Sequence, residues 1–98
     1  MSILHVVNKS PYDRPSLETA TGYMTDGDAL LLIEDGVLAA VKAGKAASQL
    51  KGRNVSVLGP DLDARGIARD KLADGVTVVD YAGFVDLVEA NDKVQSWL

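Results

Sequence analysis

The stretch that decides the fold is ALLLIEDGVLAAV, residues 29–41, in which two apolar runs are separated by Glu34, Asp35 and Gly36. The first run, residues 29–33, is apolar at every position, which is typical of a central strand of a parallel sheet with both faces covered. The second run, residues 36–43, is short and rich in alanine, which favours a helix. We therefore expect a buried strand, a junction of two acids and one glycine, and then a helix.

The same alternation of strand and helix extends along the chain in both directions. Three further strands are expected, at residues 3–7, 54–58 and 76–80. Residues 44–53 favour neither a helix nor a loop, and residues 93–98 are either a last edge strand or a docking segment. Helical segments are expected to begin at Ser16 and end at Gly22 or Gly27, and to cover residues 61–69 and 81–90. Strands that alternate with helices indicate βαβ units, so residues 1–98 are expected to form a single α/β domain. Its sheet is expected to be mostly parallel, with helices on both faces in a flavodoxin-like layering.

Local signals add detail to these helices. Ser16 is expected to be an N-cap residue with an acid in the turn that follows. Gly66 is expected to interrupt the helix at residues 61–69. In the helix at residues 81–90, the spacing of Phe84, Leu87 and Val88 predicts that these three side chains share one face.

Composition excludes several classes of function. The net charge is −4 and the basic residues are scattered, so direct binding to nucleic acid is not expected. No apolar run approaches the ~20 residues of a membrane span, and the first residues do not resemble a signal peptide. A cytoplasmic protein is therefore expected. The sequence contains no cysteine, which excludes disulfides, thiolate metal sites and cysteine nucleophiles.

Candidate functional residues gather where the expected strands end. In an open α/β sheet, ligands bind beyond the carboxyl ends of the strands. Glu34, Asp35 and Gly36 follow one strand, and Asp61, with Arg65 and Gly66, follows the next. Acids at such a position either interact with the positive end of a helix or take part in chemistry. We favour the structural interpretation for all six, and we expect Arg65 to contact a neighbouring subunit because arginine is enriched at interfaces.

The remaining candidates point to packing rather than catalysis. His5, the only histidine, lies within an expected strand without acidic neighbours in the sequence, and such a residue is more often a packed or hydrogen-bonded core residue than a ligand. Tyr81 and Trp97 are candidates for contact with a partner subunit. The loop after the first strand, NKSPYDRPS at residues 8–16, contains no glycine to cradle a phosphate. No catalytic set, metal site or cofactor is expected.

Four blocks of sequence, in order, resemble the TusB/DsrH family of small subunits of bacterial sulfur-relay complexes. The first block is similar to the family's LHxxxxSP opening. The blocks are ILHVVNKSP at residues 3–11, LLLIEDGVLAAV at 30–41, VLGPDLDARGI at 57–67 and VVDYAGFVDLVEANDKVQSWL at 78–98.

This resemblance implies a subunit of a heterohexamer with two copies each of three related proteins, the others being TusC/DsrF-like and TusD/DsrE-like. In the Tus branch the complex passes persulfide sulfur toward 2-thiolation of the tRNA wobble uridine, and in the Dsr branch it serves dissimilatory sulfur oxidation. A homo-oligomer could stand in when partners are absent. The alternative, from another class, is an independent flavodoxin-like domain that binds a small ligand or nucleotide.

The resemblance also implies where the sulfur chemistry takes place. The persulfide-carrying cysteine belongs to the TusD/DsrE-like partner. Some DsrH-type proteins carry a further cysteine in the first helix, but the matching segment here, Leu17–Thr21, contains no thiol. We therefore expect a non-catalytic subunit that does not accept sulfur itself.

Overall fold

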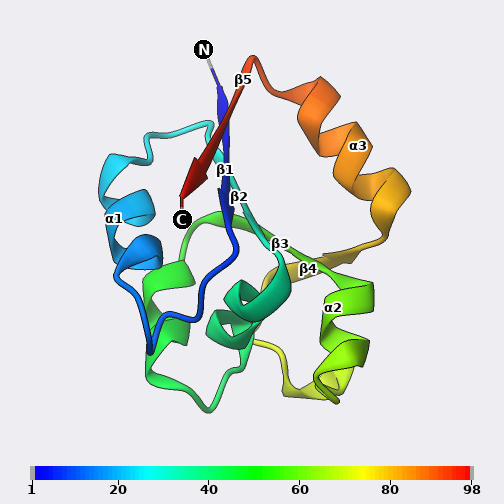
Figure 1. Ribbon diagram of the computed structural model, residues 1–98. Helices are drawn as coiled ribbons and strands as arrows, with labels where there is room; N and C mark the ends of the chain where they lie inside the picture. The colour runs from blue at the N-terminus through cyan, green and yellow to red at the C-terminus, as the bar shows by residue number, and fades with distance from the viewer. Residues whose placement is uncertain (1, 98) are drawn as a thin grey trace.

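The computed structural model describes residues 2–97 and contains one five-stranded sheet in the strand order β4-β3-β2-β1-β5 (Figure 1). All four neighbouring pairs of strands are parallel. This confirms the expected α/β fold, with a sheet that is wholly rather than mostly parallel. The strands are β1 (Ile3–Val7), β2 (Ala29–Leu32), β3 (Asn54–Leu58), β4 (Val76–Val79) and β5 (Lys93–Trp97).

Three α-helices and three short 3-10 helices connect these strands. The α-helices are α1 (Ser16–Tyr23), α2 (Gly59–Ala64) and α3 (Tyr81–Ala90). The 3-10 helices are η1 (Glu34–Ala40), η2 (Lys45–Leu50) and η3 (Arg69–Lys71).

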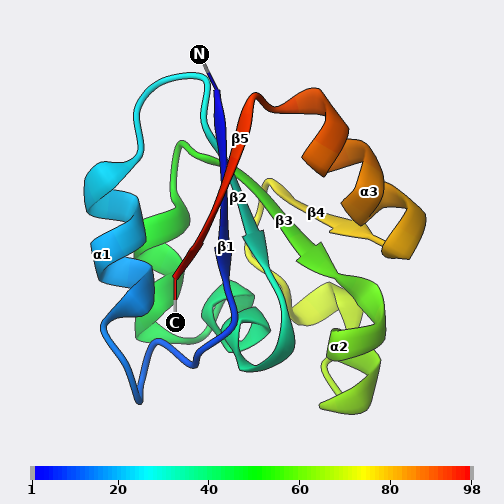
Figure 2. The ribbon, with the colours of Figure 1, turned by 45° about the horizontal axis from the view of Figure 1, so that its top comes forward.

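The order of the strands explains why helices cover both faces of the sheet. From β1 to β4 the chain steps in one direction across the sheet, and α3 then returns it to β5, beside β1. Since crossovers between parallel strands are right-handed, a reversal of direction places the next helix on the opposite face. Figures 1 and 2 accordingly show α1 and α3 on opposite sides of the sheet.

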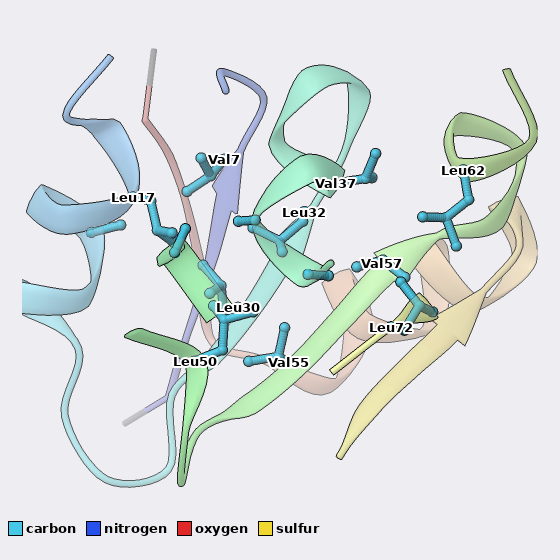
Figure 3. Packing of buried hydrophobic residues seen from close by; sticks show 14 residues of the cluster. Val7, Leu17, Leu30, Leu32, Val37, Leu50, Val55, Val57, Leu62 and Leu72 are labelled. Atoms are coloured by element: carbon cyan, nitrogen blue, oxygen red, sulfur yellow. The ribbon is translucent and has the colours of Figure 1, made fainter. Parts of the chain in front are cut away.

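The central strand β2 is buried along its whole length, as its uninterrupted apolar sequence predicts. Its side chains alternate between two hydrophobic cores. Leu30 and Leu32 point into a larger core, which also contains residues of α1, η1, η2 and α2 (Figure 3). Ala29 and Leu31 point into a smaller core, where Phe84 of α3 packs against them.

The C-terminal tail is an edge strand, one of the two outcomes that the sequence allows. β5 pairs with β1 in parallel register, with Lys93 opposite Ile3 and Trp97 opposite Val7. The first four residues of β5 are exposed, so the backbone pairing with β1 provides most of what holds this strand.

The structure corrects the expected first two helices. The segment after β2 is a 3-10 helix that begins at Glu34, two residues before the expected start of an α-helix. Its path turns directly over the end of β1, and short connectors of this kind commonly use 3-10 turns. Helix α1 includes Ser16 as its first residue, and Pro15 occupies the N-cap position without a side-chain hydrogen bond.

The structure also corrects details of α2 and α3. Helix α2 begins at Gly59 and ends at Ala64, so that Gly66 lies beyond it instead of interrupting it. In α3, Phe84 and Leu87 face the sheet as expected, but Val88 is 38% exposed. Val88 therefore lies at the exposed border of the face that Phe84 and Leu87 turn toward the sheet.

Candidate functional site at the carboxyl ends of the strands

The turn after β2 and the start of α2 are joined by a backbone-to-side-chain hydrogen bond. The N–H of Glu34 donates to the carboxylate Oδ2 of Asp61 at 2.7 Å. Glu34 adopts a left-handed conformation with φ of 49°, which few non-glycine residues do. Asp61 thus fixes the backbone where the chain leaves the sheet. Glu34 and Asp61, two predicted site residues, together have a structural role here.

Arg65 adds a second link between the same two segments. Its Nε donates to Oδ1 of Asp35 at 3.0 Å, and its Nη2 lies 2.9 Å from the same oxygen. Its Nη1 donates to the backbone carbonyl of Asp61 at 3.1 Å, within α2. The arginine that we expected at an interface between subunits therefore makes its polar contacts inside the chain, although its side chain remains partly exposed.

The two glycines of this region are required for different reasons. A Cβ on Gly36 would fall on the carbonyl oxygen of Val7, so only glycine allows η1 to cross the end of β1. Gly66 has φ of +67° and ends α2 in a Schellman motif, in which the N–H of Gly66 bonds to Asp63 and that of Ile67 to Leu62. Both glycines fix the local path of the chain.

Hydrogen bonds thus join Glu34 to Asp61 and Asp35 to Arg65, and two glycines shape the adjoining turns. We call these six predicted site residues the strand-end network: Glu34, Asp35, Gly36, Asp61, Arg65 and Gly66. The charged side chains of Asp35, Asp61 and Arg65 pair with each other or with the backbone, whereas Glu34 contributes its backbone N–H and is exposed at the surface. This arrangement fits the structural interpretation of the acids better than direct chemistry. The outer edges of Asp35 and Arg65 still reach solvent and can meet another protein.

A cleft opens between the ends of β3 and β4, where the chain continues into helices on opposite faces of the sheet. Such a switch point is where open α/β sheets usually bind ligands. Here the cleft is lined by two glycines, a proline and two valines together with Asp63, Arg69 and Asp80. Arg69 bonds to Asp63 at 2.9 Å, and Asp80 caps α3 by accepting from the N–H of Gly83 at 2.8 Å. Three polar side chains of this cleft thus make contacts within the chain.

The other two predicted site residues lie away from the strand-end network. Tyr81 begins α3 and is 62% exposed. Trp97 ends β5 and stacks on Tyr23 of α1, with ring centroids 5.4 Å apart. The eight candidate residues therefore occupy three separate regions of the structure.

Sequence reasoning missed one buried acid, Asp28, which lies just before β2. It accepts hydrogen bonds from His5 Nε2 at 3.0 Å and from the backbone N–H groups of Ile3 and Thr25. Burial alone raises the pKa of Asp28, but the hydrogen bonds from His5, Thr25 and Ile3 outweigh it, and the net pKa lies below the ordinary value. The expectation that His5 is a hydrogen-bonded core residue is confirmed. No pattern links it to Asp28, because 23 positions separate the two in the sequence.

Two further properties of residues 2–97 bear on function. No three or more histidine and acidic side chains of this part of the chain gather closely enough to hold a metal ion. None of the described helices has the length and apolar character that crossing a membrane requires.

Two solved structures share the fold of this chain. The crystal structure of the ychN protein from E. coli superposes with a TM-score of 0.84 at 23% identity, covering 99% of each chain. A protein of unknown function from Methanobacterium thermoautotrophicum superposes with a TM-score of 0.70 at 15% identity, covering 96% of this chain and 97% of the other. At these identities the likeness defines the fold class alone: a small, single-sheet, parallel α/β domain.

Relatives in sequence define the family. The model of the DsrH like protein family matches residues 9–94. Protein TusB of Pectobacterium parmentieri is 35% identical over 97 residues, and Protein TusB of Enterobacter sp. (strain 638) is 36% identical over 97 residues. Each match covers 97% of this chain and 100% of the relative. The chain belongs to the TusB/DsrH family, which confirms the resemblance carried by the four sequence blocks.

Proposed function

We propose that the chain is a non-catalytic structural subunit of a sulfur-relay complex. In this proposal it assembles with TusC/DsrF-like and TusD/DsrE-like chains into a heterohexamer in the cytoplasm. The thiol that carries persulfide sulfur comes from the TusD/DsrE-like partner, since this sequence contains no cysteine. Family membership supports the proposal, and so do the internal contacts of Asp35, Asp61 and Arg65, which give these three side chains a structural role.

One structural observation carries the proposal: α3 is an apolar helix without a buried residue. Phe84 and Leu87 rest on the sheet, but Tyr81, Val85 and Val88 are 62%, 54% and 38% exposed. Their spacing of four and three residues places them on one stripe of the helix. We call Tyr81, Val85 and Val88 the α3 stripe. Exposed apolar side chains gathered in this way are typical of a surface that another protein covers.

The experiment is co-expression of this chain with two neighbouring reading frames for related small chains, followed by affinity purification and mass determination of the intact complex. Recovery of three different chains in equal amounts, one of them with a cysteine that accepts persulfide sulfur, is the expected result. A chain that purifies as a monomer in the presence of such partners would contradict the proposal.

Two matched variants test the surface. Val85→Glu places a charge in the α3 stripe and is expected to abolish or strongly weaken assembly without unfolding the chain. Ala90→Glu places the same charge at an exposed position of the same helix, on the side opposite the stripe, and is expected to assemble normally. Equal assembly of the two variants would show that the stripe does not contact a partner.

The pathway that the complex serves can be separated from its assembly. Relatives named TusB at 30% to 36% identity support the branch that leads to 2-thiolation of the tRNA wobble uridine. Removal of the chain from its host should then abolish 2-thiouridine in digested tRNA. Normal tRNA thiolation with impaired oxidation of stored sulfur would instead identify the DsrH-like branch.

A further inference from the structure

His5 lies at the centre of a chain of hydrogen-bonded side chains that joins three distant parts of the sequence. The imidazole is 2% exposed, and its Nε2 lies 3.0 Å from Oδ2 of Asp28. On the other side of the ring, Nε1 of Trp97 donates to Nδ1 of His5 at 3.0 Å. The His5 and Trp97 rings also stack, with centroids 6.0 Å apart and an interplanar angle of 20°. These contacts connect β1, the turn before β2 and the end of β5.

The donors and acceptors of these hydrogen bonds define which nitrogen of His5 carries a proton. An indole N–H can only donate, so Nδ1 of His5 must be unprotonated in order to accept it. The ring proton therefore sits on Nε2 and is donated to the carboxylate of Asp28, which also accepts the backbone N–H groups of Ile3 and Thr25. In the structure His5 is thus a neutral imidazole with both of its nitrogens engaged.

A second proton on His5 is incompatible with the bond to Trp97. It would go to Nδ1, where the new N–H would face the N–H of Trp97, and two donors cannot share a hydrogen bond. The side chain of Trp97 otherwise packs against the edge of the larger hydrophobic core and stacks on His5 and on Tyr23, itself 69% exposed. The one polar contact of the Trp97 side chain, at the end of an exposed edge strand, is therefore lost when this buried ring is protonated.

We propose that His5 is a proton-sensitive latch for the C-terminal strand: the neutral ring holds Trp97 in place, and protonation of Nδ1 releases it and loosens the end of β5. This inference goes beyond the subunit role and does not depend on it. Three titratable groups surround the latch, one from each element packed on it: Asp28 before β2, Tyr23 of α1 and Lys93 of β5.

The chain provides its own probes, because Trp97 is its only tryptophan and His5 its only histidine. We would follow the emission of Trp97 and its quenching by acrylamide in the full-length chain from about pH 8 to about pH 5, the range in which histidine ordinarily changes its charge. The expected result is a reversible red shift and a rise in quenching on acidification, while the far-ultraviolet circular dichroism stays constant. Release of Trp97 only together with loss of circular dichroism, or no release in this range, would overturn the proposal.

Two further measurements connect the change to the ring of His5. The ¹⁵N spectrum of the labelled imidazole should show a neutral ring protonated on Nε2 near pH 8, and its titration should coincide with the change in Trp97 emission. A ring protonated on Nδ1 near pH 8, or a titration that leaves the emission unchanged, would overturn the latch. In His5→Gln, the amide oxygen can accept from Trp97 but does not titrate, so the emission should be independent of pH. A wild-type response in this variant would likewise contradict the proposal.

Discussion

The backbone N–H of Glu34 and the carboxylate of Asp61 lie 2.7 Å apart and join the end of β2 to the first turn of α2. Glu34 is the one non-glycine residue with positive φ among residues 2–97, at 49°. A left-handed conformation costs a residue with a side chain about 1–2 kcal/mol relative to a right-handed one. Asp61 compensates part of this cost by accepting a hydrogen bond that the turn would otherwise leave to water.

Asp61→Ala is expected to lower the free energy of unfolding by about 0.5–1.5 kcal/mol, because it removes this acceptor at a partly solvated position. Asp61→Asn should lose less, since the amide oxygen can still accept from Glu34. The measurement is urea denaturation followed by circular dichroism. Asp63→Ala is a suitable control in the same helix, because the carboxylate of Asp63 bonds only to Arg69 at the surface. A loss in this control as large as that in Asp61→Ala would contradict the assigned role.

Gly36→Ala is expected to be among the most damaging single-methyl substitutions in the chain. Its Cβ would fall on the carbonyl oxygen of Val7, a backbone atom of the central sheet that cannot move aside. Forcing an extra methyl group into such a site costs about 1–3 kcal/mol or more. Denaturation of the purified variant tests this.

Gly22→Ala is the matched control for that substitution. Gly22 lies in α1 and has open space where a Cβ would be. Alanine is favoured over glycine in a helix by about 0.5–1 kcal/mol, so this variant should gain stability. The prediction fails if the two substitutions have the same sign.

The sequence predicts the sheet well because its signals are local. The apolar run of β2, the alternation of strands with helices and the breaks at glycine and proline each act within a few residues. The choice between a 3-10 helix and an α-helix after β2 is not local. It depends on the contact of Gly36 with Val7, which only the pairing of β1 with β2 creates.

The candidate site was only partly predictable for the same reason. The acids after β2 and β3 could be found from their position at strand ends, but their bonds to Arg65 and to the backbone of Glu34 arise from contacts 30 and 27 residues apart. Asp28 offered even less signal, because a single acid before an apolar strand reads as a surface residue. Only the parallel pairing of β1 with β2, which sets His5 opposite Leu30, brings His5 and Asp28 together.

The ion pair between Arg65 and Asp35 is expected to contribute little to stability by itself. Nη2 of Arg65 and Oδ1 of Asp35 are 2.9 Å apart, but the Asp35 side chain is 61% exposed. Exposed pairs typically couple by about 0.2–1 kcal/mol and weaken in salt. A double-mutant cycle with Arg65→Met and Asp35→Asn, measured at low and high salt, should give a coupling in that range that shrinks at high salt. A larger coupling that does not depend on salt would mean that the pair is shielded from solvent.

Asp28 should make the free energy of unfolding fall as the pH is lowered into the acid range. Its pKa is lower in the folded chain than in the unfolded one, so folding favours its charged form. The stabilisation is therefore present above the ordinary aspartate pKa of about 3.9 and is lost as the pH falls through the lower folded-state value. Asp28→Asn is expected to be less stable at neutral pH, because both carboxylate oxygens accept N–H donors and an amide must turn its own N–H toward one of them. Leaving such a buried group unpaired costs about 1–3 kcal/mol.

Urea denaturation at steps of pH should show a shallower acid dependence of stability for Asp28→Asn than for wild type. Asp26→Asn, the same change two residues away at an exposed position, should follow wild type. If both variants keep the wild-type dependence, the acid sensitivity comes from other carboxylates, and the buried pair of His5 and Asp28 does not have the energetic role that its geometry implies.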